Sequence, residues 1–198
     1  MSDVTGTADG SDVTRTVEGV VLPAPGTWAI DTSHSSVEFT VRHLVIGKTK
    51  GRFATWSGAV QIAEEPTASS VSIEIDAASI DTKDETRDGH LRTNDFLEVD
   101  QHPKLTFTST TVKGSGKDWV VGGDLTIRGV TRPVELTLEF EGVVEKDPWG
   151  LARVAFSGRT EINREDFGLT WNQALEGGGV LVGKKVTISL EVEAVKQG

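Results

Sequence analysis

Apolar and polar residues alternate along most of this chain, and this alternation constrains the fold more than any other feature. In residues 134–141, Val, Leu, Leu and Phe occupy every second position between Glu and Thr residues. Residues 71–76 and 186–193 repeat the arrangement. Successive side chains of a β-strand point to opposite faces, so each segment predicts a strand with one apolar face. So many such strands in one small chain must pool their apolar faces in a single interior.

Eight strand candidates follow residue 26. They span residues 35–43, 52–63, 69–77, 104–113, 118–128, 131–145, 149–163 and 183–195. Gly, Pro and Asp cluster in the gaps, and short gaps favour antiparallel neighbours because parallel crossovers need a dozen residues or more. We predict an all-β protein with an eight-stranded antiparallel barrel, which is either filled by its own side chains or holds one small ligand. A sandwich of two sheets would bury the same alternation and stays open as an alternative.

Residues 84–98 break the alternation. Leu91, Phe96 and Leu97 stand there among polar residues and follow no strand pattern. The segment predicts one or two short helical turns, with Asp84 as the N-cap residue. A polar helix with a few large apolar residues is typical of a lid over an open barrel end. A plain surface connection is the alternative.

The first 26 residues differ from the rest in composition. They are rich in Ser, Thr, Gly and Asp and end in a Pro-Ala-Pro-Gly run, which predicts a flexible polar arm. A short strand over residues 17–22 remains compatible with docking on the barrel. Residues 27–198 then form one domain, a length that suits a single β-barrel. The start lacks the basic and apolar regions of a signal peptide, so we expect a cytoplasmic protein.

Charge and cysteine content narrow the possible partners. The chain has 20 Lys and Arg against 30 Asp and Glu, a net charge of −10, which opposes nucleic acid and anionic membrane surfaces. We therefore expect no nucleic-acid partner, and no stable membrane insertion because no apolar run is long enough to span a bilayer. The lack of cysteine excludes disulfides, thiolate nucleophiles and thiolate metal sites.

Two short motifs share letters with nucleotide sites but lack their context. Residues 178–184 contain the glycines and lysine of a phosphate-binding loop, yet Lys185 stands where Ser or Thr should bind magnesium. A strand rather than a helix follows, so no helix N-terminus is available for phosphate. Residues 166–168 spell a kinase signature without the glycine-rich and catalytic loops that accompany it. We reject both interpretations.

The histidines offer two interpretations. The chain contains His34, His43, His90 and His102. No pair shows metal-ligand spacing, so we predict no metal site. His43 shares the parity of Phe39 and Val41, which places it on the apolar side of its strand, either as a structural residue or as a polar contact at a cavity mouth.

A catalytic role for these residues is an alternative to simple binding. Asp31, His34 and Ser35 are close neighbours in sequence, where triad geometry is rare and turn structure is common. A small enzyme would instead use His43 or His34 as an acid or base on an apolar substrate inside the barrel. A third hypothesis is a structural or partner-binding module with a solid core.

Several short motifs, taken in order, resemble the YceI-like family. The matching segments are residues 28–31, 34–35, 39–43, 51–53, 95–97, 102–103, 107–109, 123–131, 163–169 and 182–183. The strongest is Gly-Asp-Leu-Thr-Ile-Arg-Gly-Val-Thr at residues 123–131. The resemblance covers the chain from about residue 28 to residue 195, which is nearly the whole predicted domain.

The resemblance implies a lipocalin-like eight-stranded antiparallel barrel with a helical insertion. It also implies that a long isoprenoid or other amphiphilic lipid, such as an isoprenoid quinone, binds inside the barrel as a ligand. The family supplies no catalytic residue set, so none is carried over, and no cofactor is expected besides such a bound lipid. Many members carry signal peptides and work in the periplasm, and the polar start of this chain departs from them. A homodimer stays open.

We predict a lipid-binding or carrier protein without catalytic turnover. The inward faces of the strands supply the cavity wall, namely Phe39, Val41, Phe107, Leu125, Ile127, Leu136, Leu138, Phe140 and Phe156. The candidates for the mouth or lid are His43, Phe53, Phe96, Phe167 and Trp171. Leu125 and Ile127 face inward only if the glycines at 122–123 do not form a bulge that shifts the register.

Overall fold

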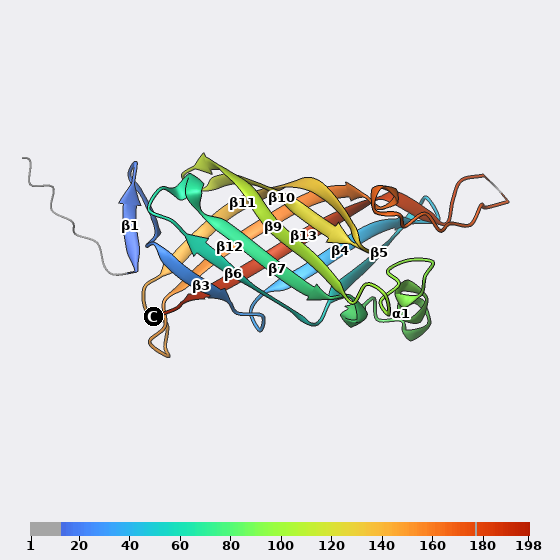
Figure 1. Cartoon of the computed structure of the whole chain (residues 1–198), viewed down its shortest axis with the longest axis horizontal. Helices are drawn as coiled ribbons and strands as arrows, with labels where there is room; N and C mark the ends of the chain where they lie inside the picture. The colour runs from blue at the N-terminus through green and yellow to red at the C-terminus, as the bar shows by residue number, and fades with distance from the viewer. Residues whose placement is uncertain (1–12, 177) are drawn as a thin grey trace, which may run out of the picture.

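A computed structural model describes residues 13–176 and 178–198, which wrap into one elongated barrel (Figure 1). The strands are β1 Thr14–Val17, β2 Val20–Pro23, β3 Gly26–Ile30, β4 Ser36–His43, β5 Gly47–Phe53, β6 Trp56–Ile62, β7 Ser70–Asp76, β8 Ile80–Asp81, β9 Lys104–Ser115, β10 Asp118–Ile127, β11 Val130–Val144, β12 Arg153–Asn163 and β13 Val182–Lys196. The helical elements are α1 Glu85–Arg92 and the 3₁₀ turns η1 Pro66–Ala68, η2 Ala77–Ser79 and η3 Arg164–Phe167.

The barrel closes because β13 pairs on both of its sides. The strand order is β12-β11-β10-β9-β7-β6-β3-β13, and β13 pairs with β12 as well. Each of these pairings is antiparallel. Hydrogen bonding therefore passes around eight strands and returns to its start. This confirms the predicted eight-stranded antiparallel barrel and rules out the two-sheet sandwich.

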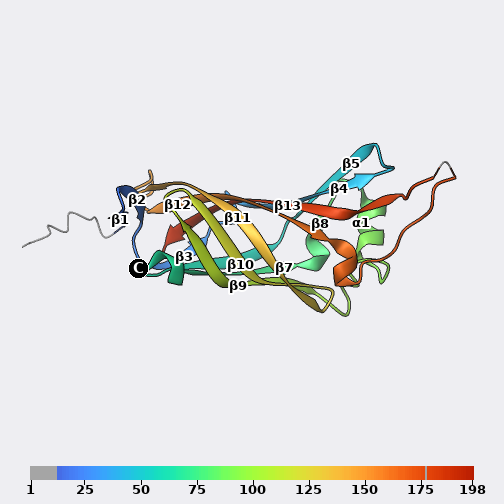
Figure 2. The ribbon, with the colours of Figure 1, turned by 90° about the horizontal axis from the view of Figure 1, so that it is seen from above.

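The wall extends further at one end, where β4, β5 and β8 join it. β13 pairs with β4 between Val182 and Glu191 and with β3 from Ala194 onward. β3 and β4 are thus consecutive parts of one barrel strand, interrupted at residues 31–35. β5 and β6 are interrupted in the same way at residues 54–55. The views in Figures 1 and 2 place β4 and β5 at the same end of the barrel as α1.

The inserted segment lies over this end and contributes Leu91, Phe96 and Leu97 to the interior. α1 begins after Asp84, whose side chain accepts hydrogen bonds from the amides of Thr86 and Arg87, so the predicted N-cap is confirmed. The polar helix is fixed to the barrel wall by Asp88, which is buried and accepts from the amide and hydroxyl of Thr82 at 2.9 and 2.6 Å. Within the described residues, no helix has the length and apolarity needed to cross a bilayer.

The β10–β11 turn is tied to the insertion. Arg128 and Gly129 have φ values of 49° and 72°, as expected for a two-residue hairpin turn that follows the twist of its strands. The Arg128 guanidinium donates to the Glu98 carboxylate at 3.0 Å and to the Gly168 carbonyl at 3.1 Å. One side chain therefore connects a barrel turn, the insertion and the segment that follows η3.

A hairpin of β1 and β2 covers the opposite end of the barrel. Leu22 is 5% exposed and packs in a cluster with Trp28, Phe140 and Val154. The indole N–H of Trp28 donates to the Ala24 carbonyl at 3.2 Å. The flexible arm predicted for residues 1–26 is therefore corrected in its described part, residues 13–26, because a few apolar side chains in this polar segment reach the barrel core. Residues 1–12 lie outside the described residues.

Candidate ligand cavity

An apolar cavity of about 310 Å³ runs through the barrel between the β1–β2 hairpin and the α1 end. Its wall is formed by the inward-facing residues of the barrel strands, and almost all of the lining surface is apolar. The volume falls within the range of small-molecule sites, about 300–1,000 Å³. The interior is therefore not filled by its own side chains, as the hypothesis of a solid core would require.

Most residues predicted for the wall and mouth line this cavity. They are Phe39, Val41, Phe53, Phe96, Phe107, Leu125, Ile127, Leu136, Leu138, Phe140, Phe156 and Phe167. Phe96 is contributed by the helical insertion together with Leu91 and Leu97. The insertion therefore covers the cavity with apolar side chains at that end.

His43 and Trp171, both predicted for the mouth or lid, are not among the residues that line the cavity. His43 has the inward parity of Val41 and pairs with Gly47 and with Val182, which lines the cavity, yet the His43 side chain is not among the lining residues. Alternation specifies the face of a strand and does not decide whether a particular side chain reaches the cavity.

Trp171 has a supporting role outside the cavity. Its ring lies edge-on to the ring of His90, with 4.7 Å between centroids, and 5.3 Å from that of Phe96. His90 also contacts the Asp95 carboxylate at 2.8 Å. Trp171 thus packs against the outer side of the insertion and helps to hold Phe96 over the cavity.

Leu125 and Ile127 were expected to face inward only if the glycines at 122–123 did not form a bulge. They do not form one, because the irregularity lies on the partner strand β9. The β9–β10 register shifts there, with Thr111 opposite Gly122 and Ser109 opposite Gly123, so the extra residue is Thr110 of β9. β10 keeps its alternation, and Leu125 faces the cavity.

Glycines opposite large side chains keep the wall thin. In the strand register Gly51 lies opposite Phe39, and Gly158 lies opposite Leu138. A Cβ atom would lie 2.3 Å from the Phe39 ring at Gly51 and 2.4 Å from Leu138 at Gly158. Each large side chain thus occupies the space that its glycine leaves free. This arrangement leaves open volume in the middle of the barrel.

Sequence reasoning passed over these glycines and several apolar wall residues. Ile73, Ile75 and Ile188 belong to alternating segments recognised in the sequence, and their parity was sufficient to place them on the wall. An isolated glycine inside a strand signals a close approach of another group, which applies to Gly51 and Gly158.

The guanidinium groups of Arg15 and Arg164 lie at the cavity boundary and are turned to backbone carbonyls. Arg15 of the hairpin donates to the Ala63 carbonyl at 2.6 Å. Arg164 of η3 is 4% exposed and donates to the carbonyls of Leu169 and of Gly183, the latter at 2.9 Å. Burial lowers the pKa of Arg164 from its ordinary value. These cations hold the hairpin and η3 in place, and the interior between them offers apolar contact.

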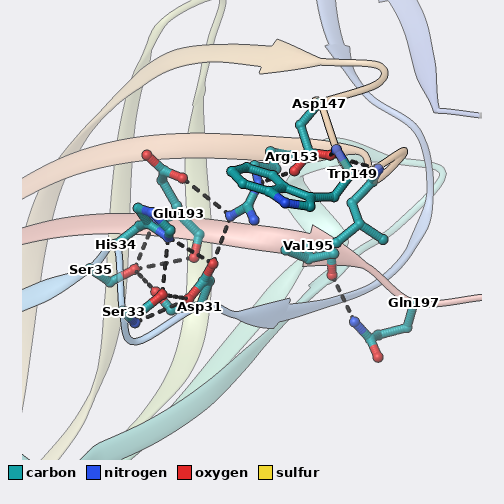
Figure 3. A network of polar contacts seen from close by, with 11 residues as sticks. Asp31, Ser33, His34, Ser35, Asp147, Trp149, Arg153, Glu193, Val195 and Gln197 are labelled. Carbon is teal, nitrogen blue, oxygen red and sulfur yellow. Dashed lines mark hydrogen bonds and ion pairs between the residues drawn. The ribbon is translucent and has the colours of Figure 1, made fainter.

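The polar cluster around Asp31 lies on the outer side of the barrel (Figure 3). Hydrogen bonds from Arg153, Ser33 and His34 hold the pKa of Asp31 well below its usual range. The Nδ1 atom of His34 is 3.0 Å from both Asp31 and Ser33, so one nitrogen meets both groups. A triad needs two different ring nitrogens for these contacts. The cluster is therefore turn structure, as predicted, and joins β3, β12 and β13.

The alternative of an acid–base enzyme requires a histidine at the cavity, and none is among the lining residues. Neither His34 nor His43 is among the lining residues. Among residues 13–176 and 178–198, no group of three or more His, Asp or Glu side chains could hold a metal ion.

Comparison with solved structures shows the same barrel. A Campylobacter jejuni YceI protein aligns with a TM-score of 0.67 at 29% identity, covering 79% of this chain and 90% of that chain. BcnA of Burkholderia cenocepacia aligns with a TM-score of 0.73 at 22% identity, covering 83% of this chain and 99% of that chain. A polyisoprenoid binding domain from Saccharophagus degradans, implicated in plant cell wall breakdown, aligns with a TM-score of 0.66 at 16% identity, covering 86% and 98%. The last two likenesses concern the fold alone.

Sequence comparison identifies the family. A UPF0312 protein of Pectobacterium carotovorum is 36% identical over 180 residues, 90% of each chain. A UPF0312 protein of Staphylococcus aureus is 38% identical over 168 residues, 84% of this chain and 95% of that protein. The model of the YceI-like domain matches residues 28–194. The chain therefore belongs to the YceI-like family.

Proposed function

We propose that this protein binds a long-chain amphiphilic lipid, a polyisoprenoid or an isoprenoid quinone, inside the barrel and carries or sequesters it. The observation that carries the proposal is the cavity of about 310 Å³ with an almost wholly apolar lining, which residues of the β1–β2 hairpin line at one end and residues of the helical insertion line at the other. An apolar tube of this kind recognises a tail by length and thickness, because its wall provides few directed polar contacts.

The energetics favour a long tail. Each isoprene unit has about five carbons and contributes up to ~3–4 kcal/mol on burial. Association costs ~4–15 kcal/mol, and micromolar affinity needs about −8 kcal/mol. Two or three units barely offset the cost of association, so a tail of several units is the natural ligand.

The polar head group belongs near an end of the cavity. Arg164 donates to backbone carbonyls, and Arg15 does so through its terminal nitrogens, while the buried Nε atom of Arg15 at the hairpin end has no hydrogen-bond partner. A head group pushed deep into the tube would lose its hydration without replacement, which is unfavourable. We therefore infer that the tail enters first and that the head stays near the boundary.

The family and fold support this ligand class. The polyisoprenoid binding domain of Saccharophagus degradans has the same barrel architecture, and the chain itself belongs to the YceI-like family. The absence of a histidine from the cavity wall also favours binding over acid–base turnover.

Native mass spectrometry of the purified protein, followed by organic extraction, tests the proposal. A co-purifying long-chain lipid in stoichiometric amount is the expected result, and delipidated protein should regain mass when a polyisoprenoid alcohol or a long-tailed quinone is added. Protein that neither retains nor takes up any such lipid would refute it. Recovery of a chemically altered lipid after incubation would instead support the alternative that the protein is a small enzyme acting on an apolar substrate.

A further inference from the structure

The β4–β5 hairpin ends in an exposed apolar tip. The tip consists of Leu44, Val45 and Ile46, together with Val180 from the loop before β13, and these side chains are 41%, 58%, 88% and 40% exposed. The Leu44 amide donates to the Leu181 carbonyl at 2.9 Å, so the hairpin and the loop form one surface. Soluble proteins rarely gather large apolar side chains at an exposed point without a partner.

The backbone of the tip adopts positive φ angles that large apolar residues rarely adopt. Leu44 and Val45 have φ values of 52° and 64°, a region that Gly and Asn enter far more readily than a β-branched residue. The Ile46 amide donates to the Leu44 carbonyl at 2.7 Å across only two residues, as in a γ-turn with positive φ, which is rare. Strain of this kind gathers at functional sites, and here it accompanies exposed apolar groups.

The hairpin around the tip is basic, although the chain as a whole is acidic. Residues 42–50 contain Arg42, Lys48 and Lys50 and no acidic residue, whereas the net charge of the chain is −10. All three basic side chains are exposed. Charges beyond about 10 Å are largely screened at moderate salt, so a partner touching the tip meets this local positive field. Apolar side chains flanked by cations are complementary to an anionic bilayer surface.

The opposite end of the barrel provides a contrast. Val144 and Trp149 are 51% and 75% exposed there. The segment between them contains Glu145, Lys146 and Asp147, a net charge of −1, and Asp147 is paired with Arg153. Residues 42–50 carry a net charge of +3 from Arg42, Lys48 and Lys50, so the β4–β5 tip is the better suited of the two patches to anionic lipid.

We propose that the apolar tip docks on the surface of an anionic lipid bilayer and holds the α1 end of the barrel against it. Docking brings the cavity close to the bilayer, because Val41 and Val182 of the cavity wall lie on the two segments that lead to the tip. Four side chains form too small a surface for a stable protein interface, which buries at least about 1,200 Å². A bilayer accepts such a small wedge without a complementary pocket. Transfer of ligand across this contact rests on the proposed function, and docking itself does not.

Vesicle flotation of the full-length protein tests docking. Vesicles of equal parts phosphatidylcholine and phosphatidylglycerol should float the wild-type protein, and raised salt should weaken this binding. Ile46→Ser should lower the bound fraction roughly tenfold, because one large apolar side chain no longer enters the lipid. Lys48→Glu should lower binding to these vesicles and leave weak binding to pure phosphatidylcholine unchanged. Val144→Ser, at the opposite end of the barrel, is the matched control and should float like wild type.

The outcomes separate this inference from the proposed function. If the wild-type protein binds no lipid in its cavity but still floats with the vesicles, the proposed function is contradicted and the docking proposal stands. A filled cavity without flotation, or equal flotation of wild type and Ile46→Ser, would overturn docking. Equal losses in Ile46→Ser and Val144→Ser would also overturn it. With both proposals correct, Ile46→Ser should keep its equilibrium ligand occupancy and take up a fluorescent polyisoprenoid from vesicles more slowly.

Discussion

The Nη1 atom of Arg153 in β12 lies 2.7 Å from the Oδ2 atom of Asp31, just after β3. The Nε atom of the same guanidinium lies 2.6 Å from Asp147 in the loop before β12. Hydrogen bonding to Arg153 holds the pKa of both carboxyl groups below their ordinary values. One cation therefore fastens the outer wall of the barrel where the strand containing β3 and β4 is interrupted.

The first prediction concerns acid stability. Because the folded-state pKa of Asp31 is depressed, its stabilisation is fully present above its unfolded value of about 3.9 and is lost as the pH falls through the folded pKa. Asp31→Asn should lower the free energy of unfolding at neutral pH by about 1–3 kcal/mol. Urea unfolding between about pH 5 and pH 2 should show a shallower decline for this variant than for wild type. Asp118→Asn, at an exposed position of β10, should decline like wild type, and a parallel decline of Asp31→Asn would contradict the assignment.

The second prediction concerns the cavity wall. Leu138→Trp should abolish lipid uptake while the protein stays folded, because the indole occupies the space reserved for the ligand. Thr137→Trp places the same side chain on the outer face of β11 and should bind normally. Circular dichroism checks the fold, and native mass spectrometry checks occupancy. Undiminished binding by Leu138→Trp would remove Leu138 from the site.

The third prediction distinguishes packed wall from open wall. Phe140 is 4% exposed, its ring centroid lies 5.7 Å from that of Phe156, and it belongs to the cluster beneath the β1–β2 hairpin. Phe140→Ala should therefore cost about 3–5 kcal/mol in denaturant unfolding of the ligand-free protein. A loss below about 1 kcal/mol would mean that Phe140 faces empty space rather than packed neighbours.

The fourth prediction concerns the insertion and uses two adjacent residues with opposite effects. Asp88→Ala removes the acceptor of both Thr82 hydrogen bonds and should destabilise α1 by about 1–3 kcal/mol. Gly89 has open space around its Cβ position, so Gly89→Ala should stabilise the helix by about 0.5–1 kcal/mol. Amide hydrogen exchange of α1 and the rate of ligand release should rise in the first variant and fall in the second. Changes of the same sign in both variants would show that α1 does not gate the cavity.

The strands of the barrel were predictable from the sequence because alternation is a direct consequence of strand geometry. The segment at residues 134–141 can bury one side only as a strand, whereas the choice between a barrel and a sandwich is decided by the pairing of β12 with β13 in the structure. The N-cap at Asp84 was predictable for a similar reason, since a short acidic side chain before a helix satisfies free amides locally.

Features that depend on distant parts of the chain were not predictable. The sequence left docking of a short strand at residues 17–22 open, but it did not identify Phe140 as a contact of Leu22, because that residue lies far away in the chain. His43 shares the parity of Val41 but does not line the cavity, although its cross-strand partner Val182 does, because parity alone does not decide which side chains reach the cavity. Trp171 was predicted for the mouth or lid, but its partner His90 was not predictable, because the contact forms between two segments far apart in sequence.

The pairing of Gly51 with Phe39 and of Gly158 with Leu138 sets the bore of the tube. At each pair, a single methyl group would displace a neighbouring side chain toward the axis and narrow the passage. Exchanges of glycine and alanine at these positions would therefore change the width of ligand that the cavity accepts, while the strand pairing stays the same. Ligand preference in such a barrel can thus change without any change of fold.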